Sequence, residues 1–322
     1  MKKVLYSRLP SKSFRKNLFS LIGKRSIITF HSFGDLDSCA SSIALSELLG
    51  KSSIIAMQDT VQSDVKNLIK DYYPKFMKFS KAIELYPNAP IIVVDCNEKN
   101  LLLNNVEEAD FLIDHHALSQ NSIKAKNYFV WPEASSTSEL VAKLFMPSEK
   151  VASLLILAIV ADSAKLINSS SDTFYVLHKL LKKYDLDFQE VCQPLYVPYP
   201  FKKRLEILKS LSSINFYHEN GYIVASGSSK IYSGLIAESL IKIGADVAFI
   251  ASTNKFCIIS ARMHKRNLFS VDLVKIVKEV GVLLGGDGGG HSLAACASGP
   301  KIENCTAALE LAKNLFFEQI KS

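Results

Sequence analysis

Residues 109–116 read Ala-Asp-Phe-Leu-Ile-Asp-His-His, an apolar run that ends in a carboxylate and two imidazoles. The run Phe111-Leu112-Ile113 is short and continuously apolar, as a strand buried on both faces of a parallel sheet would be. A single histidine in such surroundings is usually a core residue. Asp114, His115 and His116 together, at the end of a buried strand, instead favour a metal site.

Three other runs have the same apolar, β-branched character: Ser26–Phe30, Ser53–Met57 and Ile91–Val94. Helical patterns lie between and after them, at residues 38–49 and at residues 133–145. The second pattern begins with Ser136-Thr137-Ser138-Glu139, which predicts a capping box at the start of a helix. The alternation of strands and helices predicts an α/β fold with a parallel sheet.

The length of 322 residues exceeds the size at which one core usually keeps growing, so we expect two domains. We place a catalytic domain at residues 1–184, a linker at 185–204 and a smaller domain at 205–322. The linker contains Pro194, Pro198 and Pro200, followed by the basic run Lys202-Lys203-Arg204. At the N-terminus, residues 14–21 form a basic and apolar pattern, expected either to pack as a helix on the catalytic domain or to mediate pairing of two chains.

The composition restricts the class of protein. With 48% hydrophobic and 21% charged residues the chain is expected to be globular. A net charge of +7 favours anionic partners such as phosphates or short nucleic acids, and is modest for a protein that wraps a duplex. The six cysteines show no CxxC pair, so we expect reduced thiols in a cytoplasmic protein. The longest apolar run, residues 151–161, is too short to span a membrane, and no membrane span is predicted.

Polar residues follow several of the predicted strands, at the edge of the sheet where ligands of open α/β folds bind. The first strand leads to His31, Asp35 and Asp37, the third to Asp95, the fourth to Asp114, His115 and His116, and the apolar helix after Val151 to Asp162. Carboxylates gathered this closely repel one another unless cations neutralise them. Taken singly, Asp35 and Asp37 could instead cap the following helix, and Asp95 could open a loop.

These residues carry a resemblance to a known family. In order, His31-x-x-x-Asp35-x-Asp37-Ser38, Val94-Asp95, Asp114-His115-His116 and Ala161-Asp162-Ser163 resemble the four motifs of the DHH phosphoesterase superfamily. That superfamily includes RecJ-type exonucleases, nanoRNases, cyclic-dinucleotide phosphodiesterases and manganese-dependent family II pyrophosphatases. The segment 285–295 resembles the GGGH motif of the DHH-associated domain, with Ser292 in place of the usual proline. The resemblance covers residues 25–320.

The resemblance implies a two-metal hydrolase. Two divalent ions, most suitably Mn²⁺, are expected, with a hydroxide between them that attacks phosphorus. Carried over motif by motif, one ion is held by His31, Asp35 and Asp95, and the other by Asp37, Asp95, His115 and Asp162. Asp95 would bridge the two ions. The resemblance assigns His116 to the substrate phosphate and Asp114 to orienting its neighbours.

The C-terminal half is expected to be a smaller α/β domain that binds the substrate, with the active site in the cleft between the domains. Arg262, after the expected strand 256–261, lies where the family usually carries a substrate-binding arginine, although it could also be a solvated charge. The glycine-rich loop is expected to bring Gly288, Gly289, Gly290 and His291 to the substrate.

The chain length and the glycine-rich segment favour a phosphodiesterase that converts short oligonucleotides, or linear or cyclic dinucleotides, to 5′-mononucleotides. Three alternatives remain open at this point. They are a RecJ-like single-strand exonuclease, a family II-type inorganic pyrophosphatase and a non-catalytic nucleic-acid-binding member of the family. The last usually lacks several metal ligands, whereas all of them are present in this sequence. Similar proteins are commonly homodimers, so a homodimer is a further expectation.

Overall fold

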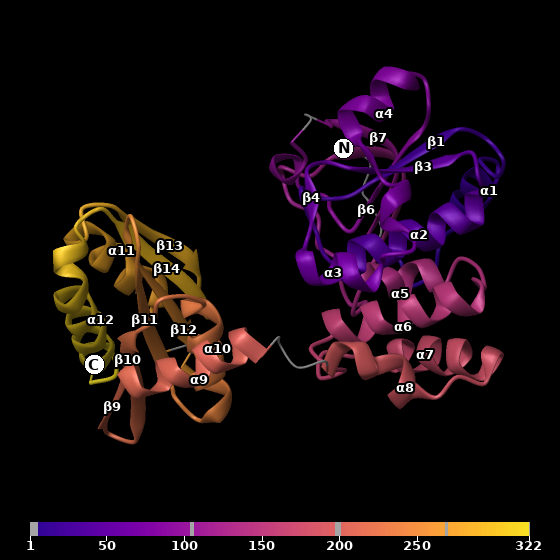
Figure 1. The fold of residues 1–322 in the computed structure, drawn as a ribbon. Helices are drawn as coiled ribbons and strands as arrows, with labels where there is room; N and C mark the ends of the chain where they lie inside the picture. The colour runs from indigo at the N-terminus through magenta and orange to yellow at the C-terminus, as the bar shows by residue number, and fades with distance from the viewer. Residues whose placement is uncertain (1–5, 104–105, 197–200, 268–269, 322) are drawn as a thin grey trace. The chain divides into compact units, whose positions relative to one another are not determined.

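The computed structural model describes residues 6–103, 106–196, 201–267 and 270–321. The chain divides into two compact units, Met1–Val197 and Pro198–Ser322 (Figure 1). The division falls within the segment expected to be a linker. That segment also contains a short helix, α8 (Phe188–Cys192), which packs on α6 (Glu149–Asp162) of the first unit. Pro198 and Pro200 lie outside the described residues.

The N-terminal unit is built on a six-stranded sheet in which every pair of neighbouring strands is parallel. Its strands, in spatial order, are β5 (Met77–Lys78), β3 (Ser53–Met57), β1 (Ser26–Thr29), β6 (Ile91–Val94), β7 (Glu108–Asp114) and β8 (Lys124–Val130). A separate parallel pair joins β2 (Phe33–Gly34) to β4 (Thr60–Val61). The predicted parallel α/β sheet is confirmed, and the four predicted strands correspond to β1, β3, β6 and β7.

Both faces of this sheet are buried. Consecutive residues of β1 enter different cores, because side chains alternate between the two faces of a strand. Ile28 packs in the main core with residues of α2 and α6, and Ile27 packs in a smaller core with Phe79 of α4. This double burial explains why the strands are continuously apolar in sequence.

The helices of this unit are α1 (Lys12–Phe19), α2 (Leu36–Leu49), α3 (Ser63–Leu68), α4 (Phe79–Leu85), α5 (Thr137–Ala142), α6, α7 (Ser171–Tyr184) and α8. The N-terminal pattern forms α1, which packs on this unit: the ring of Phe14 lies 5.6 Å from that of Phe111 and 5.7 Å from that of Phe129. Helix α5 is shorter than the expected helix at 133–145. Ser136 caps it, but the Glu139 carboxylate accepts from the amide and hydroxyl of Ser135, so the predicted capping box is only half formed.

The C-terminal unit contains a mixed six-stranded sheet, in which only β10 and β11 pair in parallel. Its strands, in spatial order, are β13 (Asp287–His291), β14 (Ala294–Gly299), β12 (Cys257–Met263), β11 (Val247–Thr253), β10 (Tyr222–Ser228) and β9 (Ile214–Glu219). Its helices are α9 (Phe201–Ser210), α10 (Ser233–Ile243), α11 (Leu273–Leu283) and α12 (Cys305–Gln319). Helix α10 covers one face of the sheet, and α11 and α12 cover the other. The expected smaller α/β domain is confirmed.

Two local expectations in this unit are corrected. Arg262 lies inside β12 rather than after it, because pairing with Ala248 of β11 and Ala294 of β14 continues the strand to Met263. The glycine-rich segment 287–291 is an edge strand rather than a loop, because it pairs along its length with β14.

The cysteines are not all reduced thiols. Cys257 at the start of β12 and Cys305 at the start of α12 form a disulfide. The sequence offers no spacing signal for this pair, because the two residues are 48 positions apart and meet only when α12 packs on the sheet. Cys39, Cys96, Cys192 and Cys296 are free thiols. None of the helices in the described ranges combines the length and apolar character that crossing a bilayer takes.

Candidate metal centre

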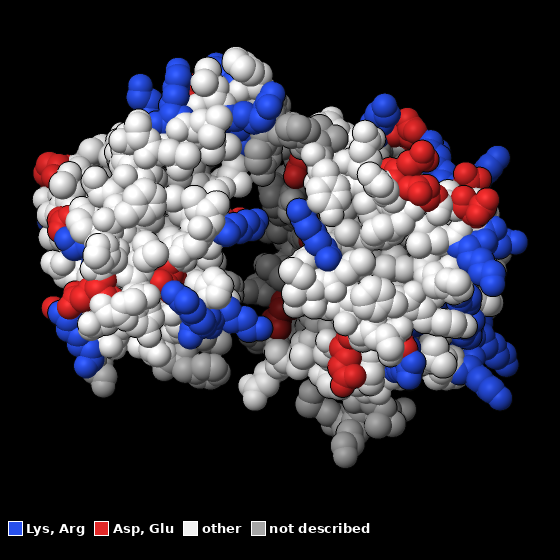
Figure 2. Space-filling model, turned by 90° about the horizontal axis from the view of Figure 1, so that it is seen from below, with Lys and Arg blue, Asp and Glu red and all other residues white. Residues whose placement is uncertain are grey.

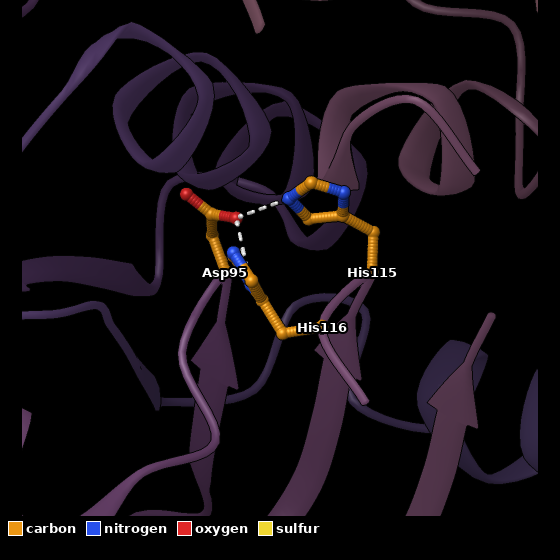
Figure 3. Close-up of side chains that lie close together, drawn as sticks. All are labelled: Asp95, His115 and His116. Carbon is orange, nitrogen blue, oxygen red and sulfur yellow. Dashed lines mark ion pairs between the residues drawn. The ribbon is translucent and has the colours of Figure 1, made fainter. Parts of the chain in front are cut away.

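The expected metal-binding residues of the N-terminal unit gather at the carboxyl ends of three strands. Strands β1, β6 and β7 are neighbours in the sheet, so their ends lie side by side. His31 lies two residues beyond the end of β1, Asp95 directly follows β6, and Asp114 ends β7. Figure 3 shows the imidazoles of His115 and His116 turned toward the carboxylate of Asp95.

Two helices bring the remaining carboxylates. Asp35 is the N-cap of α2 and accepts a hydrogen bond from the Ser38 amide at 2.9 Å. Asp37 lies in the first turn of α2, and Asp162 is the last residue of α6. Asp35 therefore both caps α2 and lies beside the other donors, since its Oδ1 is also 3.7 Å from His31 Nε2.

The donor atoms form two principal groups. The first contains His31, Asp35 and Asp95, and the second contains Asp37, His115 and Asp162. Within each group one donor atom per residue lies within 4.8 Å of the others, as a shared metal ion requires.

The carboxylate of Asp95 faces both groups. Its Oδ2 lies 3.8 Å from Nε2 of His31, and its Oδ1 lies 3.6 Å from Nε2 of His115. His115 Nε2 is also 3.4 Å from Oδ2 of Asp162. The other ring nitrogen of His115 lies 3.3 Å from the Ala134 carbonyl oxygen, an arrangement typical of metal-binding histidines because it leaves Nε2 free for the ion.

The backbone at Asp95 is unusual. Its φ of 54° lies in the left-handed region, which a residue with a side chain adopts only when the surrounding structure enforces it. The Asp95 amide donates to the Ile113 carbonyl of β7, which extends the pairing of β6 and β7 by one residue. This conformation turns the chain sharply at the end of β6, where the Asp95 carboxylate meets both donor groups.

The electrostatics of the cluster are unfavourable without cations. Burial, together with the charges of neighbouring carboxylates, raises the pKa of Asp95 well above its usual value, and burial also raises the pKa of Asp37. Burial and the charge of Asp37 raise the pKa of Asp162 to about 6. Asp35 differs: burial opposes ionisation, but hydrogen bonds from His31 and Ser38 prevail and lower its pKa to about 2.

The ion pairs of Asp95 and Asp162 in the described part of the chain are all with histidines. Buried carboxylates in such surroundings need other positive charge nearby. Oxygen donors mixed with imidazole, and no thiolate, suit a divalent ion such as Mn²⁺. The residues present therefore fit the two metal ions that the sequence motifs imply.

His116 is oriented by Asp114. The Asp114 Oδ1 lies 2.8 Å from His116 Nδ1 and also accepts from the His116 amide at 3.0 Å. This hydrogen bond raises the pKa of His116, whose side chain is 59% exposed. The Nδ1 of His116 also lies 4.0 Å from Oδ1 of Asp95, so His116 is close enough to the other donors to bind a metal ion. Its exposed ring and engaged Nδ1 leave Nε2 available to a substrate anion.

Three polar residues at this site were not singled out from the sequence. Asn97 is buried and donates to Asp114 Oδ2 at 2.7 Å and to the His116 carbonyl at 3.1 Å. Thr137 and Ser138, at the start of α5, bind the carboxylates of Asp95 and Asp37. Asn97 could have been found from its place two residues after Asp95. Residues 137 and 138 resembled only a helix cap, and their contacts join positions far apart in sequence.

A cavity of about 490 Å³ opens over these groups. Besides five of the metal-donor candidates and His116, it is lined by Cys96, Asn97, Glu98, Leu101 and Ala117. Its volume lies in the range of small-molecule sites.

The C-terminal unit places the expected substrate-binding residues on one face of its sheet. Arg262 pairs with Ala294 of β14, and Ala294 pairs with His291 of β13, so the three form one row across the strands. Ser260, Cys296 and Gly289 form the next row. The side chains of the second row are small, and His291, Cys296 and Gly289 are exposed.

The glycines of β13 differ in their surroundings. A Cβ on Gly288 would meet the backbone of Val277 in α11, and Gly288 is buried. Gly290 has a φ of 140°, which disfavours any side chain. Gly289 has nothing within 4 Å of the position of a Cβ. Packing thus accounts for Gly288 and backbone conformation for Gly290, whereas the space beside Gly289 is open.

Comparison with known proteins agrees with this geometry. The model of the DHH family N-terminal domain matches residues 25–161, and the model of the DHHA1 domain matches residues 220–318. The chain belongs to the DHH family. Members of the family are metal-dependent phosphoesterases, and this DHH protein is therefore a phosphoesterase whose acidic and histidine groups can bind metal.

Relatives of this DHH protein are named for different activities. It is 30% identical over 299 residues to the uncharacterized protein MJ0988 of Methanocaldococcus jannaschii, covering 86% of this chain and 88% of that one. It is 28% identical over 185 residues to a probable manganese-dependent inorganic pyrophosphatase of Clostridium acetobutylicum, covering 52% and 58%. An exopolyphosphatase-related protein from Bacteroides fragilis shares the fold, with a TM-score of 0.76, 17% identity and coverage of 98% and 100%.

The raised pKa values predict that, without metal, the stability of the folded protein falls as the pH rises. Asp37, Asp95 and Asp162 hold protons in the folded protein at pH values where the unfolded chain has lost them. This stabilisation is present at low pH and is lost as pH rises through the raised pKa values, about 6 for Asp162. The raised pKa of His116 acts in the same direction. With EDTA, the Tm should fall between pH 5 and pH 7.5.

Mn²⁺ should reverse this trend, because it binds the ionised carboxylates. The rise in Tm on adding Mn²⁺ should therefore be larger at pH 7.5 than at pH 5, as measured by differential scanning fluorimetry. The lowered pKa of Asp35, about 2, lies below this range. A Mn²⁺-induced shift that is equal at both pH values would contradict the proposed ionisation of the cluster.

The two neighbouring glycines should differ in their tolerance of alanine. Gly288→Ala places a methyl group against the backbone of α11 and should lower the free energy of unfolding by about 1–3 kcal/mol. Gly289→Ala enters open space and should change it by less than about 0.5 kcal/mol. Urea unfolding followed by circular dichroism measures both. Equal losses for the two variants would show that the packing of β13 on α11 is not the cause.

Proposed function

We propose that this DHH protein is a manganese-dependent phosphodiesterase that hydrolyses short oligonucleotides, or linear or cyclic dinucleotides, to 5′-mononucleotides. The observation that carries the proposal is the position of Asp95, whose two oxygens face two separate sets of donor atoms. A carboxylate in this position suits a pair of ions acting on one phosphate group.

His31, Asp35 and Asp95 would hold one ion, and Asp37, His115 and Asp162, again with Asp95, the other. When bound, two such ions supply Lewis-acid chemistry: they lower the pKa of water and neutralise charge on the phosphate oxygens. The protein's own contribution is to hold these six carboxyl and imidazole donors on strand ends and helix ends that the buried sheet fixes in place.

His116 is proposed to bind the substrate phosphate. Its Nδ1 proton is held by Asp114, and the raised pKa keeps the ring cationic to a higher pH than usual. A cationic ring can then donate from Nε2 to a phosphate oxygen. Asn97 fixes the other oxygen of Asp114, so the ring direction is set by a chain of hydrogen bonds rather than by the exposed His116 itself.

The C-terminal unit is proposed to bind the nucleotide. Arg262 and His291 offer donors to a phosphate, and the row of Ser260, Cys296 and Gly289 leaves a flat, open surface on which a base or ribose can lie. A base or ribose could contact this surface, whereas an inorganic ion has no such group, so the surface favours a nucleotide substrate.

The distribution of charge favours a small substrate over a long duplex. On the face drawn in Figure 2, Lys and Arg side chains lie in separate groups with Asp and Glu among them. A net charge of +7 over 322 residues agrees with a small anionic substrate. Inorganic pyrophosphate is the second candidate, because the Clostridium relative, which matches 52% of this chain, is named a probable manganese-dependent inorganic pyrophosphatase.

The choice between these substrates is open to direct assay. With Mn²⁺ present, we expect release of mononucleotides from pApA, from cyclic di-adenylate or from short RNA, with turnover falling as single strands lengthen. Asp95→Asn should reduce the rate below about 1% of wild type, because it removes the charge shared by both donor groups. The control is Asp71→Asn, an exposed carboxylate paired with Lys150. Turnover of pyrophosphate alone would overturn the proposal in favour of the second candidate.

The nucleotide surface predicts a selective effect of bulk at Gly289. Gly289→Val adds a side chain in open space, so the fold should persist while the surface beside Cys296 is obstructed. The KM for a dinucleotide should rise about 10-fold. The turnover of bis(p-nitrophenyl) phosphate, which has no nucleoside, should change little. Asn215→Val, an exposed position on β9 at the opposite edge of the sheet, is the matched control. An unchanged KM for the dinucleotide would remove this surface from the substrate site.

A further inference from the structure

The start of α5 contacts the carboxylates of both donor groups. The Thr137 hydroxyl donates to Asp95 Oδ1 at 3.0 Å. The Thr137 amide donates to Asp37 Oδ2 at 2.6 Å, and the Ser138 amide to Asp37 Oδ1 at 2.8 Å. One turn of the chain thus fixes the Asp95 carboxylate, which faces both groups, and the Asp37 carboxylate, which belongs to the second.

We propose that Thr137 is a positioning residue that sets the plane of the Asp95 carboxylate, so that each of its oxygens serves a different cation. The proposal rests on the two-cation site described above. Rotation of an aspartate carboxylate about its last torsion is only loosely restricted by covalent geometry, so a neighbouring donor must fix it. The hydroxyl approaches Oδ1, the oxygen on the His115 side, and leaves Oδ2 facing His31.

The chemistry of threonine suits this role. Its hydroxyl is neutral, so it can remain beside the carboxylate with or without bound cations, whereas lysine or arginine would compete with them. Its β-branched side chain has few rotamers, and Thr137 is fully buried, so the direction of the hydroxyl is well defined. Both Asp95 and Asp37 are buried, so hydrogen bonds to them are stronger than those at the surface.

The turn that carries Thr137 is anchored independently of that hydroxyl. The Ser136 hydroxyl accepts from the Glu139 amide at 3.1 Å. The buried Glu139 carboxylate accepts from Lys143 at 2.7 Å and from the Thr173 hydroxyl at 2.8 Å. Lys143 also pairs with Asp172 at 3.1 Å, and Asp172 pairs with Arg8. Removing the hydroxyl alone should therefore leave the turn in place.

The test is Mn²⁺ binding to Thr137→Val, which keeps the shape of the side chain and removes only the donor. Isothermal titration with Mn²⁺ should show that at least one of two binding events is weakened about 10- to 100-fold. The low-temperature electron paramagnetic resonance spectrum should lose the signature of two coupled Mn²⁺ ions. Thr137→Ser, which restores the hydroxyl, should return both readouts toward wild type.

Thr173→Val is the matched control. It also removes a buried threonine hydroxyl that donates to a buried carboxylate, but that carboxylate is Glu139, outside both donor groups. Both valine variants should lower the Tm in EDTA, but only Thr137→Val should weaken the binding of Mn²⁺. Equal weakening by the two variants would mean that the effect is one of general stability, and would overturn the proposal.

Wild-type Mn²⁺ affinity and an unchanged resonance spectrum in Thr137→Val would also overturn it. If that variant does not fold, Thr137→Ala and Thr137→Ser make the same comparison. Mn²⁺ affinity and the coupled-ion signature should be lost in Thr137→Ala and retained in Thr137→Ser. Because the binding measurements need no substrate, they separate this proposal from the proposed function. If Thr137→Val lost the coupled Mn²⁺ pair while the wild-type protein hydrolysed no nucleotide, the positioning role would be upheld and the phosphodiesterase rejected.

Discussion

The repulsion among four carboxylates at one edge of the N-terminal sheet is the constraint on which the rest of this site depends. Asp35, Asp37, Asp95 and Asp162 come from a strand end and from the ends of two helices, and burial makes the ionised form of three of them unfavourable. Folding alone gives no reason to gather them. Two cations supply the reason, because they turn a destabilising cluster into a set of ligands.

The scaffold meets this constraint with neutral donors instead of positive side chains. Backbone amides hold Asp37, a hydroxyl holds Asp95, and the Asn97 amide holds Asp114. Each contact orients a carboxylate without satisfying its charge, so the affinity for a cation is retained. The positively charged side chains nearby, Arg8 and Lys143, pair instead with Asp172 and Glu139, which are not among the metal donors. These ion pairs stabilise the turn that carries Thr137.

The fold and the gathering of donor residues were predictable because both follow from local pattern. Apolar runs such as 91–94 indicate buried parallel strands, and polar residues directly after them must meet at one edge. The contacts of Thr137 were not predictable, because they join residues 42 and 100 positions apart in sequence. The glycine-rich segment 287–291 predicts a loop, because glycine is rare in strands, whereas it forms an edge strand. Of its glycines, only Gly288 is explained by the packing of α11.

The left-handed backbone of Asp95 has a consequence for the stability of the folded protein. The residue combines a strained φ with a buried charge, and each of these costs the folded state free energy. Asparagine tolerates that backbone region better and carries no charge, and glycine removes the strain altogether. In a chain that bound no cations, replacing Asp95 by asparagine or glycine would therefore stabilise the fold, so this position exchanges stability of the folded state for the capacity to bind cations.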